Sequence, residues 1–200
     1  MKKALQHLKK DPVMRTIIER VGPYTMEFRE PGFSTLVRSI VYQQLSGKVA
    51  TVILQRLIGA LPDGELTPHN ILRLRPDRMR KLGLSRAKTE YIRDLARRIV
   101  KGEIAFDLLL ELEDDAVIEH LTRVKGIGVW TAHMFLMFAL QRPNVLPVGD
   151  LGVRAAIRKQ YGLEALPTVR EMEELAKPWH PYCSVATWYL WRSLDGSAQI

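Results

Sequence analysis

Apolar residues recur along this chain every three or four positions, which is the spacing of amphipathic helices. The pattern is clearest over residues 86–101, where one apolar stripe contains Ile92, Leu95, Ala96 and Ile99. The alternating pattern typical of strands is nearly absent. The sequence therefore predicts an all-α fold of about nine to eleven short helices joined by short loops.

Capping residues mark the starts of several of these helices. Aspartate, serine and threonine side chains accept hydrogen bonds from the free N–H groups of a first helical turn, and proline suits the first helical position. Such starts occur at Asp11 with Pro12, at Thr67 with Pro68, at Ser85, and at Thr168, which can form a capping box with Glu171. They predict helices that begin at residues 12, 68, 86 and 169.

The segment 33–57 contains two apolar stripes with a polar interruption between them. The first stripe consists of Leu36, Val37, Ile40 and Val41, and the second of Val49, Val52 and Ile53. The interruption, YQQLSG, is either a turn between two core helices or a loop that presents Gln43, Gln44 and Leu45 to a ligand. The pattern supports both interpretations about equally.

A second junction, KGIG, joins the helical patterns of 115–124 and 129–140. Gly126 and Gly128 permit a tight turn with positive φ, and they leave room for another group to approach closely. The helix that follows starts with free N–H groups and a partial positive charge, both of which suit a phosphate. Such a helix–hairpin–helix can hold a DNA backbone without recognising its sequence. A corner between two packed helices is the structural alternative.

A single acidic residue, Asp150, lies in the segment LPVGDLGVR, just before another helical pattern. Aspartate is a common N-cap, so this side chain could simply cap that helix. Taken alone, capping is the simpler interpretation.

Composition narrows the class of protein. At 200 residues, with 46% hydrophobic and 26% charged residues, the chain has the make-up and length of a globular protein with a core. No apolar run approaches the ~20 residues that span a membrane, and the basic N-terminus lacks the apolar stretch of a secretory signal. The single cysteine, Cys183, excludes an internal disulfide and a four-cysteine metal site. A reducing cytoplasm is the expected compartment.

The net charge of +8 favours a polyanionic partner. Nucleic acid and an anionic membrane face are both compatible with it. The basic residues are spread over many predicted helices rather than gathered on one amphipathic helix, which argues against the membrane.

The hairpin and the aspartate together resemble a known family. LTRVKGIGVWTA followed by LPVGDLGVRAAI is similar to the helix–hairpin–helix and Gly/Pro-rich loop with aspartate of the HhH–GPD superfamily of DNA base-excision glycosylases, and Pro147, Gly149 and Asp150 match its second half. The similarity extends over DPVMRTIIERVGPY, IVYQQLSGKVA, GLSRAKTEYIRDLA and PWHPYCSVATWYLW. It is greatest to the 3-methyladenine DNA glycosylase II branch, in a compact form without the N-terminal β-domain of the bacterial type.

The resemblance implies a chemistry. Asp150 would stabilise the oxocarbenium-like sugar as the N-glycosidic bond breaks, and it could also orient the attacking water. Trp130 stands where lyase-competent members carry a lysine, so a monofunctional enzyme that leaves the strand intact is expected. The C-terminal cysteines of the endonuclease III branch are missing, so no iron–sulfur cluster and no catalytic cofactor are expected.

The same resemblance assigns binding roles. Trp130, Trp188, Tyr42 and Tyr24 are candidates for a pocket that stacks on a flipped cationic base, whereas core packing is the simpler expectation for Trp179 and Trp191. DNA contacts are assigned to Gln43, Gln44, Leu45, Ser46, Lys125, Gly126 and Gly128, with Gln44 at the position that fills the gap left by the base. The backbone carbonyls of Thr122, Val124 and Ile127 would hold Na⁺ or K⁺ at the hairpin.

The predicted organisation has two lobes, residues 33–141 and residues 1–32 with 142–200, and Asp150 at the cleft between them. The predicted function is removal of 3-methyladenine from double-stranded DNA by a cytoplasmic monomer, nucleoid-associated in a bacterium, with 7-methylguanine and 1-methyladenine as further candidate substrates. The alternatives are a non-catalytic helix–hairpin–helix module that binds DNA, and an enzyme of the superfamily acting on oxidised or mismatched bases. The module would need neither Asp150 nor a pocket tryptophan. A lysine at position 130 or an iron–sulfur cluster would favour the other enzymes, and the sequence has neither that lysine nor the cysteines of such a cluster.

Overall fold

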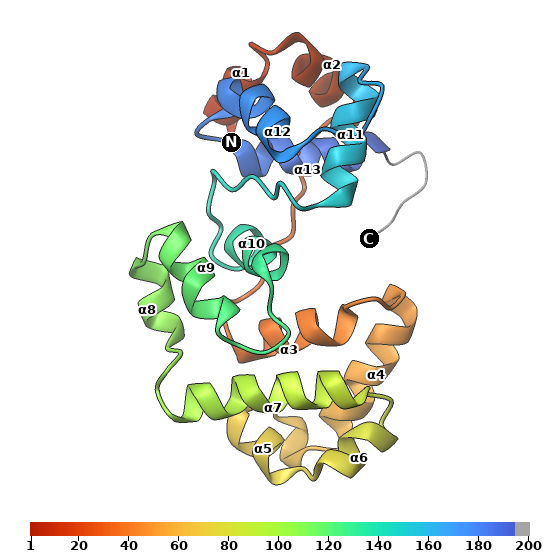
Figure 1. The fold of residues 1–200 in the computed structure, drawn as a ribbon, viewed down its shortest axis with the longest axis vertical. Coiled ribbons are helices and arrows are strands. Elements are labelled where there is room, and N and C mark those ends of the chain that lie inside the picture. Colours follow the sequence, from red (N-terminus) through yellow and green to blue (C-terminus); the bar gives the residue numbers. More distant parts are fainter. Residues whose placement is uncertain (195–200) are drawn as a thin grey trace. The chain divides into compact units, whose positions relative to one another are not determined.

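The computed structural model describes residues 1–194, and it confirms the all-α prediction (Figure 1). Within that range the chain forms thirteen α-helices and two short 3₁₀ helices, and no strand. The sequence predicted fewer helices. Three of the observed helices, α1, α6 and α8, are only six or seven residues long, which is too short for a periodic apolar pattern to be recognised.

The chain divides into two compact units, Met1–Phe28 with Gln141–Ile200 as unit 1, and Arg29–Leu140 as unit 2. The helices of unit 1 are α1 (Lys2–Leu8), α2 (Pro12–Val21), α11 (Leu151–Tyr161), α12 (Val169–Ala176) and α13 (Cys183–Leu194), with the 3₁₀ helix η2 (Lys177–Trp179). The helices of unit 2 are α3 (Phe33–Tyr42), α4 (Gly47–Gly59), α5 (Pro68–Arg73), α6 (Pro76–Lys81), α7 (Arg86–Val100), α8 (Phe106–Glu111), α9 (Asp114–Thr122) and α10 (Val129–Phe138), with η1 (Pro62–Gly64).

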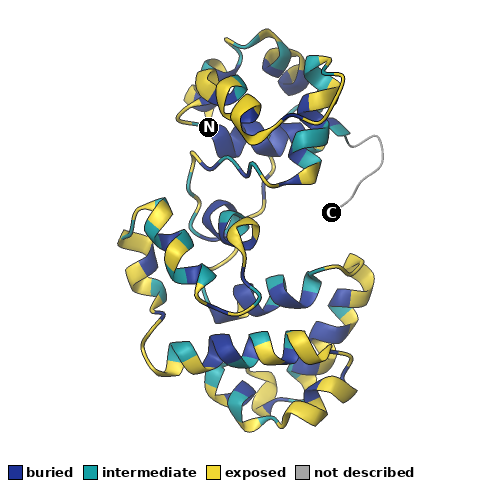
Figure 2. Cartoon of the chain, in the orientation of Figure 1, coloured by how far each residue is buried: buried dark blue, intermediate teal, exposed yellow. Residues whose placement is uncertain are grey.

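Unit 1 is built around α13. Every residue from Cys183 to Leu190 is buried, and α13 is dark blue along most of its length in Figure 2. It packs against α2 and α11. A helix buried on all sides shows no single apolar face, and the run CSVATWYL accordingly mixes small, polar and aromatic residues.

Asp11 confirms the predicted cap of α2 and also joins three elements of unit 1. One carboxylate oxygen accepts the Val13 N–H at 2.8 Å. The other oxygen accepts the Tyr161 hydroxyl at 2.6 Å and the Trp179 indole N–H at 3.0 Å. Burial and the hydrogen bond to Asp11 raise the pKa of Tyr161, so its hydroxyl keeps the proton that it donates. Trp179 is fully buried, which confirms its predicted place in the core.

The other three predicted caps are also confirmed. Thr67 accepts from the Asn70 N–H and Ser85 from the Lys88 N–H. Thr168 and Glu171 form the complete capping box of α12. These local signals succeed because donor and acceptor lie within one helical turn of each other in the sequence.

Unit 2 is organised around α7, which packs against α3, α5 and α6. The guanidinium of Arg93 donates to the Leu74 carbonyl at 2.8 Å, beyond the C-terminal end of α5. No helix within residues 1–194 combines the length and apolar character needed to cross a membrane.

One predicted stripe of unit 2 is confirmed, and the other is confirmed only at Ile53. Leu36, Val37, Ile40 and Val41 of α3 are fully buried. On α4, however, Val49 and Val52 are 47% and 40% exposed, and Ile53 is buried together with Ala50, Leu54 and Leu57. Several faces of this helix carry apolar residues, and only tertiary packing decides which of them faces the core.

Candidate functional site

The KGIG hairpin joins α9 to α10 in unit 2. Gly126 has φ +79°, as predicted, and a Cβ placed on it would lie 2.0 Å from Cδ2 of Tyr91 on α7. The close approach that this glycine permits is therefore made by a ring of the same unit. The positive φ predicted for Gly128 is wrong. Its φ is −94°, and it is the N-cap of α10 in an extended conformation.

A carboxylate beneath the hairpin holds its backbone. Asp94 of α7, only 8% exposed, accepts the Lys125 N–H at 3.1 Å and the Arg98 Nε–H at 3.0 Å. Burial opposes the charged form, but these two donors outweigh it and hold the pKa of Asp94 below its usual value. The Lys125 ammonium is exposed and lies 2.9 Å from Glu90.

The YQQLS loop is attached to the same hairpin. The Gln43 side chain donates to the Gly126 carbonyl at 2.8 Å. The ammonium of Lys88 on α7 donates to the carbonyls of Val41 and Gln43 at 2.8 and 2.6 Å, and burial lowers its pKa. Helix α7 therefore supports both the loop and the hairpin.

The tip of that loop is exposed and strained. Gln44 has φ +55°, a left-handed conformation that costs a non-glycine residue about 1–2 kcal/mol. Gln44, Leu45 and Ser46 are all exposed, with Leu45 at 37%. Such strain is common at binding sites. The segment is thus a turn between two core helices, and it also presents three side chains to solvent.

Two of the predicted pocket aromatics belong to unit 2. Trp130, in the first turn of α10, is 47% exposed. Tyr42 is half-buried, with its hydroxyl 2.6 Å from the Thr51 hydroxyl and the Arg38 guanidinium 4.1 Å from its ring centre. Val129, next to Trp130 in the chain, is 52% exposed, so two adjacent large apolar residues are exposed at the start of α10, and contiguous apolar exposure is typical of a binding surface.

Asp150 lies in unit 1, at the end of a loop that α13 holds in place. The buried Ser184 hydroxyl donates to the Arg142 carbonyl at 2.6 Å and accepts the Val145 N–H at 2.9 Å. The Asp150 N–H closes a turn on the Pro147 carbonyl at 2.9 Å. These contacts fix the backbone that carries the carboxylate.

Asp150 is itself 8% exposed, and its carboxylate accepts directed hydrogen bonds. Its Oδ1 accepts the Val153 N–H at 2.7 Å, which makes it the N-cap of α11, and the Trp191 indole N–H at 3.0 Å. Gly152 leaves room for the hydrogen bond from Trp191 to Asp150. A Cβ at this position would crowd both partners, at 3.1 Å from Asp150 Oδ1 and 3.3 Å from Trp191 Cδ1.

Trp191 was expected to pack in the core, and the structure instead makes it a candidate site residue. It is half-buried, and its N–H points at the carboxylate. The signal available was weak: Trp188 and Trp191 are three residues apart, so they lie on neighbouring parts of one helix face. Nothing in that spacing identifies a partner 41 residues away.

The other two predicted pocket aromatics meet in unit 1. The rings of Tyr24 and Trp188 are 4.8 Å apart between centres, and burial raises the pKa of Tyr24 to about 12. Trp188 borders a hollow of about 540 Å³ that Arg20, Thr25 and Arg192 also line. The Arg192 guanidinium lies 5.5 Å from the Trp188 ring centre.

The predicted cation ligands lie at the C-terminal end of α9 and in the hairpin. The Val124 carbonyl accepts the Ile127 N–H at 3.1 Å, which closes the turn. Thr122 is the last residue of α9, where helix carbonyls carry partial negative charge that suits a cation. Among residues 1–194 no group of three or more His, Cys, Asp or Glu side chains converges as a metal site.

Comparison with known proteins connects these features. Residues 37–181 match the family model of the HhH-GPD superfamily base excision DNA repair protein. The chain is 32% identical over 189 residues to the DNA-3-methyladenine glycosylase 1 of Schizosaccharomyces pombe, covering 92% of this chain and 82% of that protein.

Solved structures agree with this match. The S. pombe 3-methyladenine DNA glycosylase in complex with abasic DNA superposes with a TM-score of 0.84 at 33% identity, over 94% of this chain and 95% of that one. A DNA-3-methyladenine glycosidase from Bacillus halodurans gives a TM-score of 0.84 at 35% identity, over 94% and 87% of the two chains.

Proposed function

The chain belongs to the HhH-GPD superfamily of base excision DNA repair proteins, and from this premise we propose that it is a monofunctional DNA glycosylase for alkylated purines in duplex DNA. The observation that carries the proposal is the Asp150 carboxylate, which is buried yet oriented by Val153 and Trp191. Asp11 has the same kinds of partner, an N-cap N–H and an indole N–H, so what sets Asp150 apart is its place in the Pro147–Gly149–Asp150 segment, inside the residues that match the family.

The proposed reaction hydrolyses the N-glycosidic bond of a flipped nucleotide. As the bond stretches, positive charge develops on the sugar, and the Asp150 carboxylate stabilises it. Water then adds to the anomeric carbon and loses a proton, which leaves an abasic site. A purine alkylated at N3 or N7 is cationic before cleavage and departs as a neutral base, so a second acid to protonate the leaving group is not required. The proposed substrates are 3-methyladenine, then 7-methylguanine and 1-methyladenine.

The remaining site residues are assigned roles around this step. The hairpin holds the DNA backbone through Lys125 and the start of α10, and Gln44 with Leu45 fills the gap left by the flipped base. Trp130, Trp188, Tyr24 and Tyr42 supply aromatic faces for the cationic base. Trp130 has no amine with which to attack the sugar, so the strand stays intact, and a monomer suffices for the reaction.

A monovalent cation at the hairpin fits the same proposal. The carbonyls of Thr122, Val124 and Ile127 would hold Na⁺ or K⁺, because backbone oxygens are hard ligands. When bound, the cation would supply positive charge for a DNA phosphate. The residues around it keep the role of shaping the turn.

The test is release of free base from methylated duplex DNA, with strand breaks assayed before and after alkali. We expect 3-methyladenine to appear in solution and breaks to appear only after alkali. If the folded protein binds this DNA and releases no base, the alkyl-base assignment fails, which leaves the non-catalytic module or an enzyme that acts on a different lesion. Breaks without alkali would contradict the monofunctional mechanism and make Lys125 the next residue to replace.

Replacing Trp191 with Phe should slow excision without weakening DNA binding. Phenylalanine keeps an aromatic ring at this position of α13 but lacks the indole N–H that donates to Asp150 Oδ1. We expect the single-turnover rate at saturating DNA to fall about 10- to 100-fold, the loss of about 1.5–3 kcal/mol from a hydrogen bond to a charged group, with the Kd for DNA unchanged.

Trp179→Phe is the matched control for this variant, because Trp179 also donates its indole N–H to an N-cap aspartate, Asp11. This control should lose stability but excise at the wild-type rate where it is folded. Equal excision rates for both variants would show that Trp191 has only a structural role.

Replacing Gln44 with Gly should separate loop strain from loop function. Glycine adopts φ +55° freely, so the free energy of unfolding should stay within about 1 kcal/mol of the wild type. Without the side chain that fills the gap, excision from duplex DNA should fall at least about tenfold, since unstacking a base costs a few kcal/mol.

Gln141→Gly provides the control for loop strain, because Gln141 has φ +54° and is also exposed. Both variants should be equally stable, and only Gln44→Gly should be slow. A wild-type rate for Gln44→Gly would exclude Gln44 as the residue that fills the gap.

A further inference from the structure

The positive charge of the chain is concentrated in one segment of unit 2. Residues 73–101 contain eleven Lys or Arg and three Asp or Glu, a net charge of +8, which equals that of the whole chain. The rest of the protein therefore carries no net charge. This segment comprises the end of α5, α6 and α7.

Four of the basic residues on α7 have structural partners, among them Lys88, which donates to the carbonyls of Val41 and Gln43. Arg93 donates to the carbonyl of Leu74. Arg97 and Arg98 lie 3.6 and 3.0 Å from the Asp94 carboxylate, which also holds the hairpin. Their charge is accounted for by the fold.

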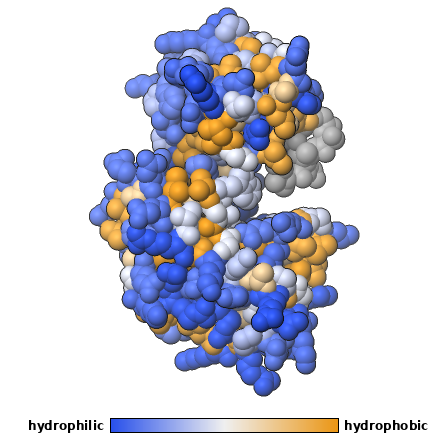
Figure 3. Space-filling model, viewed as in Figure 1, coloured by the Kyte–Doolittle hydropathy of each residue, from blue (hydrophilic) through white to orange (hydrophobic). Residues whose placement is uncertain are grey.

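A second group of basic residues, at the end of α5 and on α6, has no such structural partners in the part of the chain that the structure describes. Arg73, Arg75, Arg78, Arg80 and Lys81 are all exposed, and none of them forms an ion pair within residues 1–194. We call these five residues the α5–α6 basic surface. Figure 3 shows mainly hydrophilic side chains over this end of the unit.

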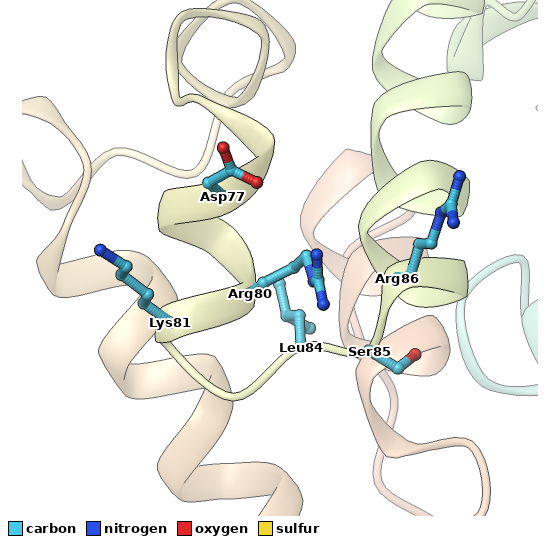
Figure 4. A pocket seen from close by; sticks show the side chains of 6 residues that line it. All are labelled: Asp77, Arg80, Lys81, Leu84, Ser85 and Arg86. Atoms are coloured by element: carbon cyan, nitrogen blue, oxygen red, sulfur yellow. The ribbon is translucent and has the colours of Figure 1, made fainter.

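The basic residues are dense on the short helix α6. Arg78, Arg80 and Lys81 all occupy the last turn of this six-residue helix, and Arg78 and Lys81, three positions apart, are like charges on neighbouring positions. Figure 4 shows Arg80 extending from α6 toward the loop that leads to Ser85 and Arg86. These side chains border a hollow of about 560 Å³ in which Asp77 is the one acidic lining residue.

The surface lies on a different side of α7 from the hairpin. Lys88 and Tyr91, which contact the YQQLS loop and the hairpin, share one face of α7. Arg93, which contacts the end of α5, lies about 140–160° around the helix from both of them by the 100° step of an α-helix. In Figure 1, α5 and α6 lie on one side of α7, and α3 with the hairpin lies on the other.

We propose that the α5–α6 basic surface binds the phosphate backbone of duplex DNA separately from the hairpin, and thereby holds the enzyme on undamaged DNA. Duplex DNA carries one negative charge per about 1.7 Å of its axis, which matches a dense, exposed and unpaired set of cations. Guanidinium groups suit phosphate oxygens through paired N–H donors, and four of the five residues are arginines. The surface contributes affinity without sequence preference.

The proposal rests on the proposed function only in taking DNA as the partner. It is tested with the triple variant Arg78→Gln, Arg80→Gln, Lys81→Gln and an undamaged duplex oligonucleotide, titrated at several KCl concentrations. The matched control is Lys10→Gln, Lys159→Gln, Arg170→Gln, which removes the same charge from exposed positions of unit 1.

We expect the slope of log K against log [KCl] to become shallower by about 2–3 in the α6 variant, because each phosphate that a side chain neutralises accounts for about 0.9 of this slope. Its Kd at low salt should weaken at least about tenfold, while the control changes less than about twofold. Single-turnover base release at saturating methylated DNA should stay at the wild-type rate in both. Base release separates the glycosylase proposal from the proposal for the basic surface. If the wild type releases no base at all, the glycosylase proposal is contradicted, and the binding result for the basic surface still stands.

Equal salt slopes for the α6 variant and wild type would overturn the proposal. So would equal decreases in affinity for the α6 variant and the control, because net charge alone would then account for the binding. Circular dichroism and urea denaturation of both variants establish that they are folded.

Discussion

Asp150→Asn is expected to reduce base release by about a hundred- to a thousandfold while leaving fold and DNA binding intact. Asparagine keeps an oxygen that can accept from Val153 and Trp191, and it caps helices as well as aspartate does. The free energy of unfolding should therefore change by less than about 1 kcal/mol. What is lost is the negative charge beside the developing sugar cation, and one electrostatic group of this kind is commonly worth at least about 10²–10³ in rate.

The measurement is single-turnover release of 3-methyladenine at saturating DNA, with the Kd for the same DNA measured in parallel. Asp11→Asn is the matched control, because Asp11 is also an N-cap of unit 1 that accepts a tryptophan N–H. It should excise at the wild-type rate where it is folded. A rate within tenfold of wild type for Asp150→Asn would restrict Asp150 to capping.

Gly126→Ala is expected to be the most destabilising substitution in the hairpin, at about 2–5 kcal/mol. The new Cβ would meet the Tyr91 ring at 2.0 Å, and overpacking of a rigid contact costs about 1–3 kcal/mol. The positive φ adds about 1–2 kcal/mol. Urea denaturation measures the change in the free energy of unfolding, and DNA affinity should fall with it because the displaced turn carries Lys125.

Two further variants separate these contributions. Gly128→Ala places a Cβ where nothing lies within 4 Å, at a negative φ, and should cost less than about 1 kcal/mol. In a Tyr91→Ala background the clash disappears, so Gly126→Ala should cost only the backbone strain. If Gly126→Ala and Gly128→Ala cost the same, the close approach of Tyr91 has no energetic weight.

Much of the site followed from local sequence. Asp150 was predicted both as a helix cap and as the catalytic carboxylate, and the cap is confirmed. The cap was predictable because Asp150 and the Val153 N–H are only three residues apart. The turn at Gly126 was predicted because glycine alone adopts its conformation freely. The motif pair around the hairpin and Asp150 also led to the family.

Other parts of the site depended on residues far apart in the sequence. Gln43 was expected to face DNA, yet its amide is bonded to the Gly126 carbonyl, 83 residues away. Lys125 was expected at a phosphate, and its ammonium lies against Glu90. Neither contact could be predicted, because each depends on how α3 and the hairpin pack against α7.

By itself the sequence determined the helical class, the four capped helix starts and the positions of the hairpin and the aspartate. These features depend on hydrogen bonds and torsion angles within about four residues of the chain, and each is therefore encoded locally. Tertiary structure alone decided that Trp191 donates to Asp150, that Tyr91 supports Gly126, and that Val49 and Val52 face solvent. Those outcomes depend on which helix faces are buried together, and packing between distant segments decides that.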